Sequence, residues 1–435
     1  MNITLPTNVY DKRAAKMLKD YIKKVRRSRT SSYFLTGKKK RNNIADVTRS
    51  SMVIETDAGR KQFSLSFKKI QQAISFIFSK RIVSRKELEK YSNFNSALMG
   101  LLEAVLFEVA RIQRSVRGIL QIRMIGVKFF FSGMDKCSNA DFQTVVFNGG
   151  TAVLCTYFHL RAKGKGLDPF MERLRESGLK LMVDSGTFSL FNAVEKGKKI
   201  VDHDTYNSLT AKQRKEMNIV KDITVEEYAL TLNKYSDLIY GFFNLDVIGD
   251  TEASNQNFQR LKELTGRSPI PVWHCDVHDW KKSDFKSLDA MVNEDYEIIA
   301  LGATVMLGKN AGPANQNKVK EELFKEIFNR YPDQCFHWLG GSSDLLLKFP
   351  FFSADSSGWI QGRKINQIYS FEETSTERMD NWSQERCIAY NVYSLSSLEY
   401  LSEGVQGSLL FNEFKTEKKN KTPQLECQLE FGFGI

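Results

Sequence analysis

Two aspartates, Asp184 and Asp355, occupy positions where carboxylates can do covalent chemistry. Each ends a short apolar run that is typical of a buried strand, and each is followed by small residues that favour a turn. Barrel enzymes keep their reacting groups at the C-terminal ends of parallel strands. Two carboxylates in one site can act as nucleophile and proton donor. The alternative is that both residues cap the helices that follow them.

Eight apolar runs alternate with stretches of helical periodicity in the second two-thirds of the chain. We predict strands at 126–131, 152–158, 179–183, 239–247, 270–274, 297–303, 334–339 and 351–354. We predict helices at 168–177, 225–236, 253–264, 283–292, 316–330 and 382–402. This alternation predicts an α/β fold, and eight strands predict a (β/α)8 TIM barrel. An open doubly wound sheet is the alternative, but the first strand is not followed by a glycine-rich nucleotide-binding turn.

The first third of the chain is strongly basic. Residues 1–130 hold 28 basic and 9 acidic residues, a net charge of +19, whereas the remainder carries −7. Aromatic residues interleave with the cations, which is typical of a surface that contacts nucleic acid. We therefore expect a nucleic-acid contact at Arg26, Arg27, Lys38, Lys39, Lys40 and Arg41. A solvated basic surface is the alternative interpretation.

The composition indicates three segments in a soluble chain of 435 residues. We expect a basic, α-rich N-terminal module at 1–122, a barrel domain at 123–410 and a charged tail at 411–435. Within the module we predict helices at 10–30, 67–79 and 97–116, and a hairpin of 51–58 with 62–67. No apolar run is long enough for a membrane span, and no secretory signal is visible. The six scattered cysteines fit a cytoplasmic protein with reduced thiols.

The ends of the predicted strands supply the lining of a pocket. Glycines there let a flat ligand approach the backbone, and Phe188, Trp273 and Trp338 could stack on it. The substrate-binding candidates are Ser185, Gly186, Phe188, Asp246, His274, Gly302, Leu339 and Gly340. These types indicate a site for a planar heterocycle beside a carboxylate pair. A zinc site is the alternative, since His274, Cys275, Asp276 and His278 are all possible ligands.

The motifs at these strand ends resemble the tRNA-guanine transglycosylase superfamily, and especially its DNA-acting branch, the DpdA proteins of bacteria and phages. The family's Asp-Ser-Gly-Gly-(Phe/Tyr)-Gln is similar to the segment 184–189, and its Ala-Ile-Gly-Gly is similar to 300–303. Its Tyr-Leu-Met-Gly is similar to 337–340, and its nucleophilic aspartate falls at Asp355. The family's Cys-x-Cys-x-x-Cys zinc clip and the Pro-Thr-Arg-like segment after the nucleophile are missing here. The resemblance covers residues 125–370.

The resemblance implies a base exchange in which guanine in a polynucleotide is replaced by a free 7-deazaguanine such as preQ0. It implies that Asp355 is the nucleophile and Asp184 the proton shuttle. Phe188 would stack on the base, Asp246 would read its edge, and His274 would stand at a base-reading position. No redox cofactor or ATP would be needed, and with the zinc clip absent we expect no cofactor, although zinc is possible. The basic module and the missing clip favour DNA over tRNA as the partner. A nucleoside deoxyribosyltransferase or glycosylase and a non-catalytic nucleic-acid-binding protein are the alternatives.

Overall fold

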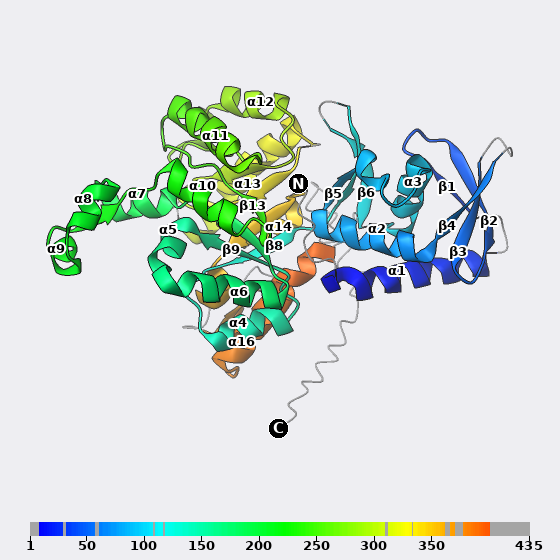
Figure 1. Ribbon diagram of the computed structural model, residues 1–435, viewed down its shortest axis with the longest axis horizontal. Coiled ribbons are helices and arrows are strands. Elements are labelled where there is room, and N and C mark those ends of the chain that lie inside the picture. The colour runs from blue at the N-terminus through cyan, green and yellow to red at the C-terminus, as the bar shows by residue number, and fades with distance from the viewer. Residues whose placement is uncertain are drawn as a thin grey trace.

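The computed structural model describes residues 8–28, 32–56, 61–107, 109–115, 118–308, 312–332, 334–361, 366–369 and 377–400 (Figure 1). The predicted tail at 411–435 and the turn of the predicted hairpin lie outside these residues. In the part of the chain that the structure describes, no helix combines the length and the apolar character needed to cross a membrane.

An eight-stranded parallel sheet forms the centre of the larger domain, as the sequence predicts. Its strands are β8 (Lys128–Ser132), β9 (Ala152–Thr156), β10 (Lys180–Asp184), β13 (Ile239–Phe242), β14 (Val272–His274), β15 (Ile299–Gly302), β16 (Phe336–Trp338) and β17 (Ser353–Ser356). They pair in the order β13-β10-β9-β8-β17-β16-β15-β14. The sheet curls into a half-barrel, which is compatible with a TIM-like fold. The two end strands, β13 and β14, approach each other through a single parallel bridge between Phe243 and Ile270.

Helices cover the outer face of this sheet (Figure 1). They are α4 (Asn139–Phe147), α5 (Tyr157–Leu160), α6 (Leu167–Ser177), α10 (Val225–Lys234), α11 (Thr251–Thr265), α12 (Phe285–Asn293), α13 (Pro313–Arg330), α14 (Leu345–Lys348), α15 (Gly358–Gln361) and α16 (Gln384–Ser397). The six predicted helices all lie among them. Between β10 and α10 the chain adds α7 (Thr187–Glu195), β11 (Lys199–Val201), α8 (His203–Ser208), α9 (Ala211–Glu216) and β12 (Ile219–Lys221). In Figure 1, α8 and α9 project beyond the sheet.

Side chains alternate between the two faces of each strand and so form two separate apolar layers. The outer layer packs against the helices and includes Phe131, Val183 and Ala354. The inner layer is small and includes Phe130 and Met182. These residues directly precede Phe131 and Val183 in the chain and point to the opposite face of the sheet. This alternation decides which polar residues of a strand reach the inside of the curled sheet.

The N-terminal module combines helices with two antiparallel sheets. The first sheet contains β1 (Tyr33–Leu35), β2 (Arg41–Val47), β3 (Ser51–Thr56) and β4 (Gln62–Ser66), and the second contains β5 (Ile82–Ser84), β6 (Ala110–Arg114) and β7 (Leu120–Met124). The helices are α1 (Asn8–Arg27), α2 (Phe67–Lys80) and α3 (Asn95–Val105). The predicted hairpin is confirmed as β3 and β4.

The α-rich description of the module needs a correction, because strands make up much of it. The helix predicted at 97–116 ends at Val105, and its last third is the strand β6. Residues 110–114 pair with β7 at five positions. Helical spacing of apolar residues could not distinguish this strand, since a short half-buried strand also presents apolar residues at intervals.

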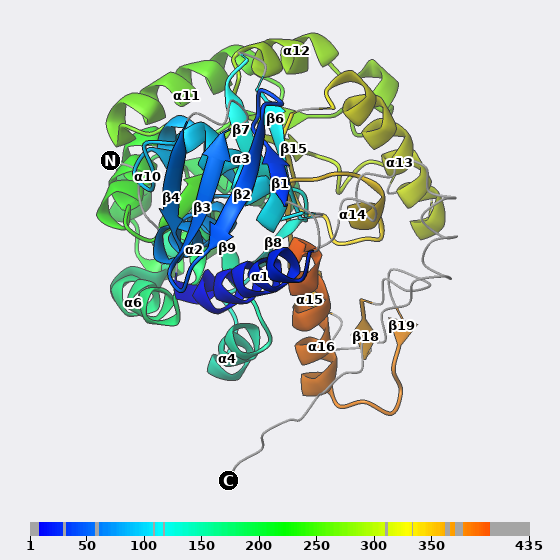
Figure 2. The same ribbon diagram turned by 90° about the vertical axis from the view of Figure 1, so that its right-hand side faces the viewer.

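The module packs against the N-terminal end of the half-barrel (Figure 2). Tyr240 donates a hydrogen bond to the Lys80 carbonyl at 3.0 Å, and Arg123 donates one to the Pro350 carbonyl at 3.3 Å. An apolar cluster of Ile82, Ile298, Cys335 and Phe352 seals the contact. The basic module therefore sits at the opposite end of the strands from Asp184 and Asp355.

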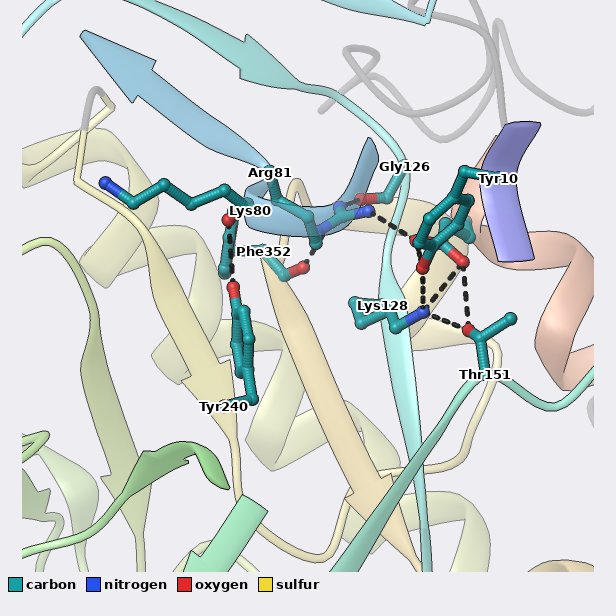
Figure 3. A network of polar contacts seen from close by, with 9 residues as sticks. Tyr10, Lys80, Arg81, Gly126, Lys128, Thr151, Tyr240 and Phe352 are labelled. Carbon is teal, nitrogen blue, oxygen red and sulfur yellow. Dashed lines mark hydrogen bonds and ion pairs between the residues drawn. The ribbon is translucent and has the colours of Figure 1, made fainter. Parts of the chain in front are cut away.

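A buried ionic network holds this end together (Figure 3). Glu399, in the short helical turn after α16, accepts from Lys128 at 2.9 Å, from Arg81 at 3.3 Å and from the Tyr10 hydroxyl at 3.1 Å. Burial alone would raise the pKa of Glu399, but Lys128 and Arg81 outweigh it and hold the pKa below its ordinary value. A third basic side chain, Lys180, is 2 % exposed, and burial together with Lys128 lowers its pKa strongly, which favours its neutral form. The Glu399 carboxylate thus compensates the buried charges of Arg81 and Lys128.

We expect Glu399→Gln to destabilise the protein by about 3–5 kcal/mol, because removing one partner leaves buried charges uncompensated. Urea unfolding at neutral pH measures the loss. Glu326→Gln is the matched control, since Glu326 pairs with Arg330 on the surface of α13. That change should cost at most about 0.5 kcal/mol. Equal effects of the two substitutions would contradict a central role for the network.

Candidate active site

Three carboxylates meet at the C-terminal ends of the strands. Asp184 ends β10, Asp355 lies in β17, and Asp246 follows β13 in the loop that leads to α11. Asp246 and Asp355 are close enough to Asp184 to act on its ionisation. Both are buried, at 8 % and 6 % exposure. The sequence prediction that Asp184, Asp246 and Asp355 share one site therefore agrees with their placement.

Asp355 is held by three hydrogen-bond donors from β8 and β16, the two strands that flank β17, and from the turn after β16. Its Oδ1 accepts from the Gly340 backbone N–H at 3.0 Å and contacts Nε2 of His337 at 3.2 Å, while its Oδ2 accepts from the Ser132 hydroxyl. Gly340 presents its N–H from a backbone with φ of 72°, where a Cβ would also approach Val305 to 2.5 Å. The three donors fix the carboxylate and leave Oδ2 as the less occupied oxygen.

His337 links Asp355 to the strand beneath it. The side chain is fully buried, and its Nδ1 lies 2.8 Å from the Ser353 hydroxyl. If the Ser353 hydroxyl donates to Nδ1, the neutral ring carries its proton on Nε2 and donates it to Asp355. His337 is thus a positioning residue for this carboxylate.

Asp184 sits in a different environment. Burial, followed by the nearby charges of Asp246 and Asp355, raises the pKa of Asp184 from 3.8 to about 7. Hydrogen bonds from Thr156 and the Gly186 backbone oppose this rise without cancelling it. Asp184 is therefore a carboxyl group that can hold or release a proton near neutrality. Carboxylates whose environments separate them in this way are typical of acid–base pairs.

Asp246 and His274 form a second polar pair in the site. Oδ2 of Asp246 contacts Nε2 of His274, and the Asp246 carbonyl accepts from the Thr187 hydroxyl at 2.9 Å. The imidazole lies directly over Gly302, where a Cβ would come within 2.6 Å of Nδ1. Gly302 is therefore required for the position of His274. Among the described residues, Oδ1 of Asp246 has no hydrogen-bond partner, so it is available to a ligand.

The other predicted substrate-binding residues have different placements. Ser185 is buried, and its hydroxyl lies 3.3 Å from that of Thr187. Gly186 is the N-cap residue of α7 and has φ of 97°. A Cβ at this position would come within 2.6 Å of the Phe158 side chain, so a larger residue would disturb the start of the helix. Leu339 packs against the inner apolar layer. Phe188 is 44 % exposed on α7 and stacks near Phe191, with ring centroids 6.4 Å apart.

The predicted stacking roles of Trp273 and Trp338 are wrong. Both side chains are 2 % exposed and belong to the outer apolar layer between the sheet and the helices. The Trp273 indole donates to the Asp284 carbonyl at 2.9 Å, and the Trp338 indole donates to Thr304 at 2.8 Å. Each tryptophan directly neighbours an inward-facing histidine, and adjacent strand residues point to opposite faces.

The possible zinc ligands do not converge. His274 contacts Asp246, the Cys275 thiol lies 3.7 Å from the Gly302 carbonyl, and Asp276 accepts from the backbone N–H of His278 at 2.8 Å. Within the described ranges, no group of three or more His, Cys, Asp or Glu side chains is arranged to hold a metal ion.

Three residues of the site were not among the candidates from sequence: Ser132, His337 and Thr156. All three face inward on β8, β16 and β9, and each contacts one of the catalytic candidates. Strand alternation is the signal that could have found them, because Ser132 and His337 lie on the same faces as the inner apolar residues Phe130 and Leu339.

The predicted nucleic-acid-binding residues lie in the N-terminal module and are exposed. Arg26 and Arg27 end α1, and Arg26 donates to the Thr48 carbonyl at 3.1 Å. Lys38, Lys39 and Lys40 form the turn before β2, and Arg41 begins that strand. The module that carries them lies at the N-terminal ends of the parallel strands, whereas the carboxylates lie at the C-terminal ends.

The chain matches no protein-family model and no curated protein. The resemblance to transglycosylases thus rests on the residues of the site itself.

We expect the contribution of Asp184 to stability to fall as the pH rises from about 4 to about 7, since the folded Asp184 keeps a proton that the unfolded chain loses. Asp184→Asn should reduce this fall, which urea unfolding at several pH values would measure. Asp276→Asn is the control, because hydrogen bonds from the Asp279 and His278 N–H groups lower the pKa of Asp276 and confine its effect to lower pH. Parallel curves for Asp184→Asn and the wild type would contradict the raised pKa.

Proposed function

We propose that the protein is a glycosyl-transferring enzyme that exchanges guanine in DNA for a free 7-deazaguanine of the preQ0 type. The observation that carries the proposal is the division between the two carboxylates. Asp355 is fixed by three donors, and Asp184 has a pKa of about 7. One group suits a nucleophile and the other a proton shuttle. A closed (β/α)8 barrel and the family resemblance are part of the same proposal.

In the first displacement, Oδ2 of Asp355 attacks C1′ of the target nucleotide. The bond from C1′ to the guanine nitrogen breaks, and Asp184 gives its proton to the departing base. In the second displacement, the incoming 7-deazaguanine attacks C1′, loses its proton to Asp184, and releases Asp355. Two displacements at one carbon retain its configuration. The reaction consumes neither a redox cofactor nor ATP.

The pair of Asp246 and His274 supports recognition of the base. Oδ1 of Asp246 can accept hydrogen bonds from the N–H groups on the edge of a guanine-like ring. His274 is the more exposed partner, with 30 % of its side chain accessible against 9 % for Asp246. A ring that contacts Oδ1 of Asp246 would also meet the His274 side chain, which packs on Gly302, and Phe188 would stack from α7. The target nucleotide must leave a duplex stack to reach this depth.

Asp355→Ala should abolish base exchange while the protein stays folded and still binds DNA. Incorporation of labelled guanine or preQ0 into DNA measures the exchange, and tRNA in a parallel reaction distinguishes the two polynucleotides. A denaturation-resistant protein–DNA adduct should form with the wild type and not with the variant. Asp276→Asn, in the loop that follows β14, is the control and should keep its activity. Normal turnover by Asp355→Ala would exclude Asp355 as the nucleophile.

Asp184→Asn should lower the exchange rate by a factor on the order of 10²–10⁴, the usual contribution of general acid–base catalysis. The asparagine keeps the size of the side chain but cannot transfer a proton. The wild-type rate should also change with pH near 7, and the variant should lose this dependence. An unchanged rate and pH profile in Asp184→Asn would remove this residue from the mechanism.

A further inference from the structure

The N-terminal module contains a cavity of about 700 Å³ that is separate from the carboxylate site. It lies where the inner face of the sheet β1–β4 meets the start of α3. Its basic lining residues are Lys38, Lys40, Arg41 and Arg85, and among the described residues no aspartate or glutamate lines it. A cavity with four cations and no anion has a strongly positive potential.

The basic side chains that line the cavity have no anionic partner among the described residues. Lys38, Lys40 and Arg85 make no ion pair with any described carboxylate. Arg41 donates to the side chain of Asn43 at 3.0 Å and lies over the Tyr33 ring at 4.2 Å, which are contacts with neutral groups. Lys39 has φ of 59° in the turn and does not line the cavity. The turn thus directs two of its three lysines toward the cavity.

The interior of the cavity is polar where the rest of the sheet's inner face is apolar. Asn42 follows the same face of β2 as the core residue Ile44, and it is only 5 % exposed. Its side-chain amide lines the cavity but forms no hydrogen bond with a described residue. Thr56 on β3, which is the cross-strand partner of Asn42, also lines the cavity. Because Asn42 is nearly buried yet lines the cavity, its side-chain amide can hydrogen-bond to a ligand there.

The first turn of α3 opens into the same cavity. Phe94 occupies the N-cap position, so no side chain caps the helix, and the first turn has no acidic residue. Asn95, Ser96 and Ala97 line the cavity at this end. Uncapped backbone N–H groups and the helix dipole favour an anion, and phosphate is the common one. Beside them, Phe94 is 46 % exposed and stacks on Phe63 with ring centroids 3.9 Å apart.

We infer that this cavity binds a phosphate group of a single-stranded nucleic acid. The Asn42 amide and the backbone N–H groups at the N-terminus of α3 donate hydrogen bonds to the phosphate, and a base stacks on Phe94. The cations neutralise the phosphates, and an exposed aromatic ring beside them is typical of single-strand binding. This inference rests on the proposed function only in taking the same polynucleotide as the ligand. Because the module lies at the far end of the sheet, the cavity acts as an anchoring site away from the exchanged base.

The test is fluorescence anisotropy of a labelled single-stranded DNA of about 12 nucleotides, titrated with the full chain at several salt concentrations. Lys38→Gln/Lys40→Gln should weaken binding by at least about tenfold and flatten the salt slope by roughly 1.4 units, since each lost contact on a single strand contributes about 0.7. The matched control is Lys68→Gln/Lys69→Gln, which removes the same charge from the exposed face of α2. This control should have a much smaller effect.

Asn42→Leu tests the interior of the cavity without changing charge, and it should weaken binding severalfold. Equal effects of the two lysine pairs, together with normal binding by Asn42→Leu, would overturn the cavity as the site. Competition by millimolar inorganic phosphate as effective as competition by DNA would overturn a nucleic acid as the ligand. Base exchange by the wild-type protein separates the two proposals. If the wild type exchanges no base but the cavity variants lose DNA binding, the cavity stands and the proposed function fails. If the wild type exchanges bases and the cavity variants bind DNA normally, the proposed function stands and the cavity fails.

Discussion

The compensation of buried cations by Glu399 is the interaction on which the arrangement of the chain depends. Its carboxylate joins α1 through Tyr10, the end of α2 through Arg81, and the first barrel strand through Lys128. These contacts bring the two ends of the described chain onto the sheet at one place. Because the charges are deeply buried, none of the partners can leave without exposing the others to an apolar environment.

This network also separates the carboxylate site from the module. The N-terminal ends of the strands are filled by the basic side chains and covered by the module. The C-terminal ends carry the three carboxylates of the candidate site. Such a division, with stability at one end of parallel strands and chemistry at the other, is a general property of barrel enzymes.

Together, the two proposals imply a path for a polynucleotide between the two ends of the parallel strands. The proposed anchoring cavity lies in the module, whereas Asp355 and Asp184 lie past the length of the strands. A single strand held at the cavity would have to pass along the outside of the domain before its base entered the site. A flexible, unpaired strand can follow such a path, and it also presents its base already unstacked. The two proposals therefore favour the same form of nucleic acid.

The sequence by itself determined the order of strands and helices, because apolar periodicity and turn residues are local properties. It also placed Asp184, Asp246, His274 and Asp355 at strand ends, and parallel strands bring those ends together. Only the tertiary structure decided which side chains face inward, since a shift of one residue turns a side chain to the other face. For that reason His337 became a partner of Asp355, while Trp273 and Trp338 became core residues. The strand β6, the Glu399 network and the basic cavity depend on contacts between distant segments, which no local pattern encodes.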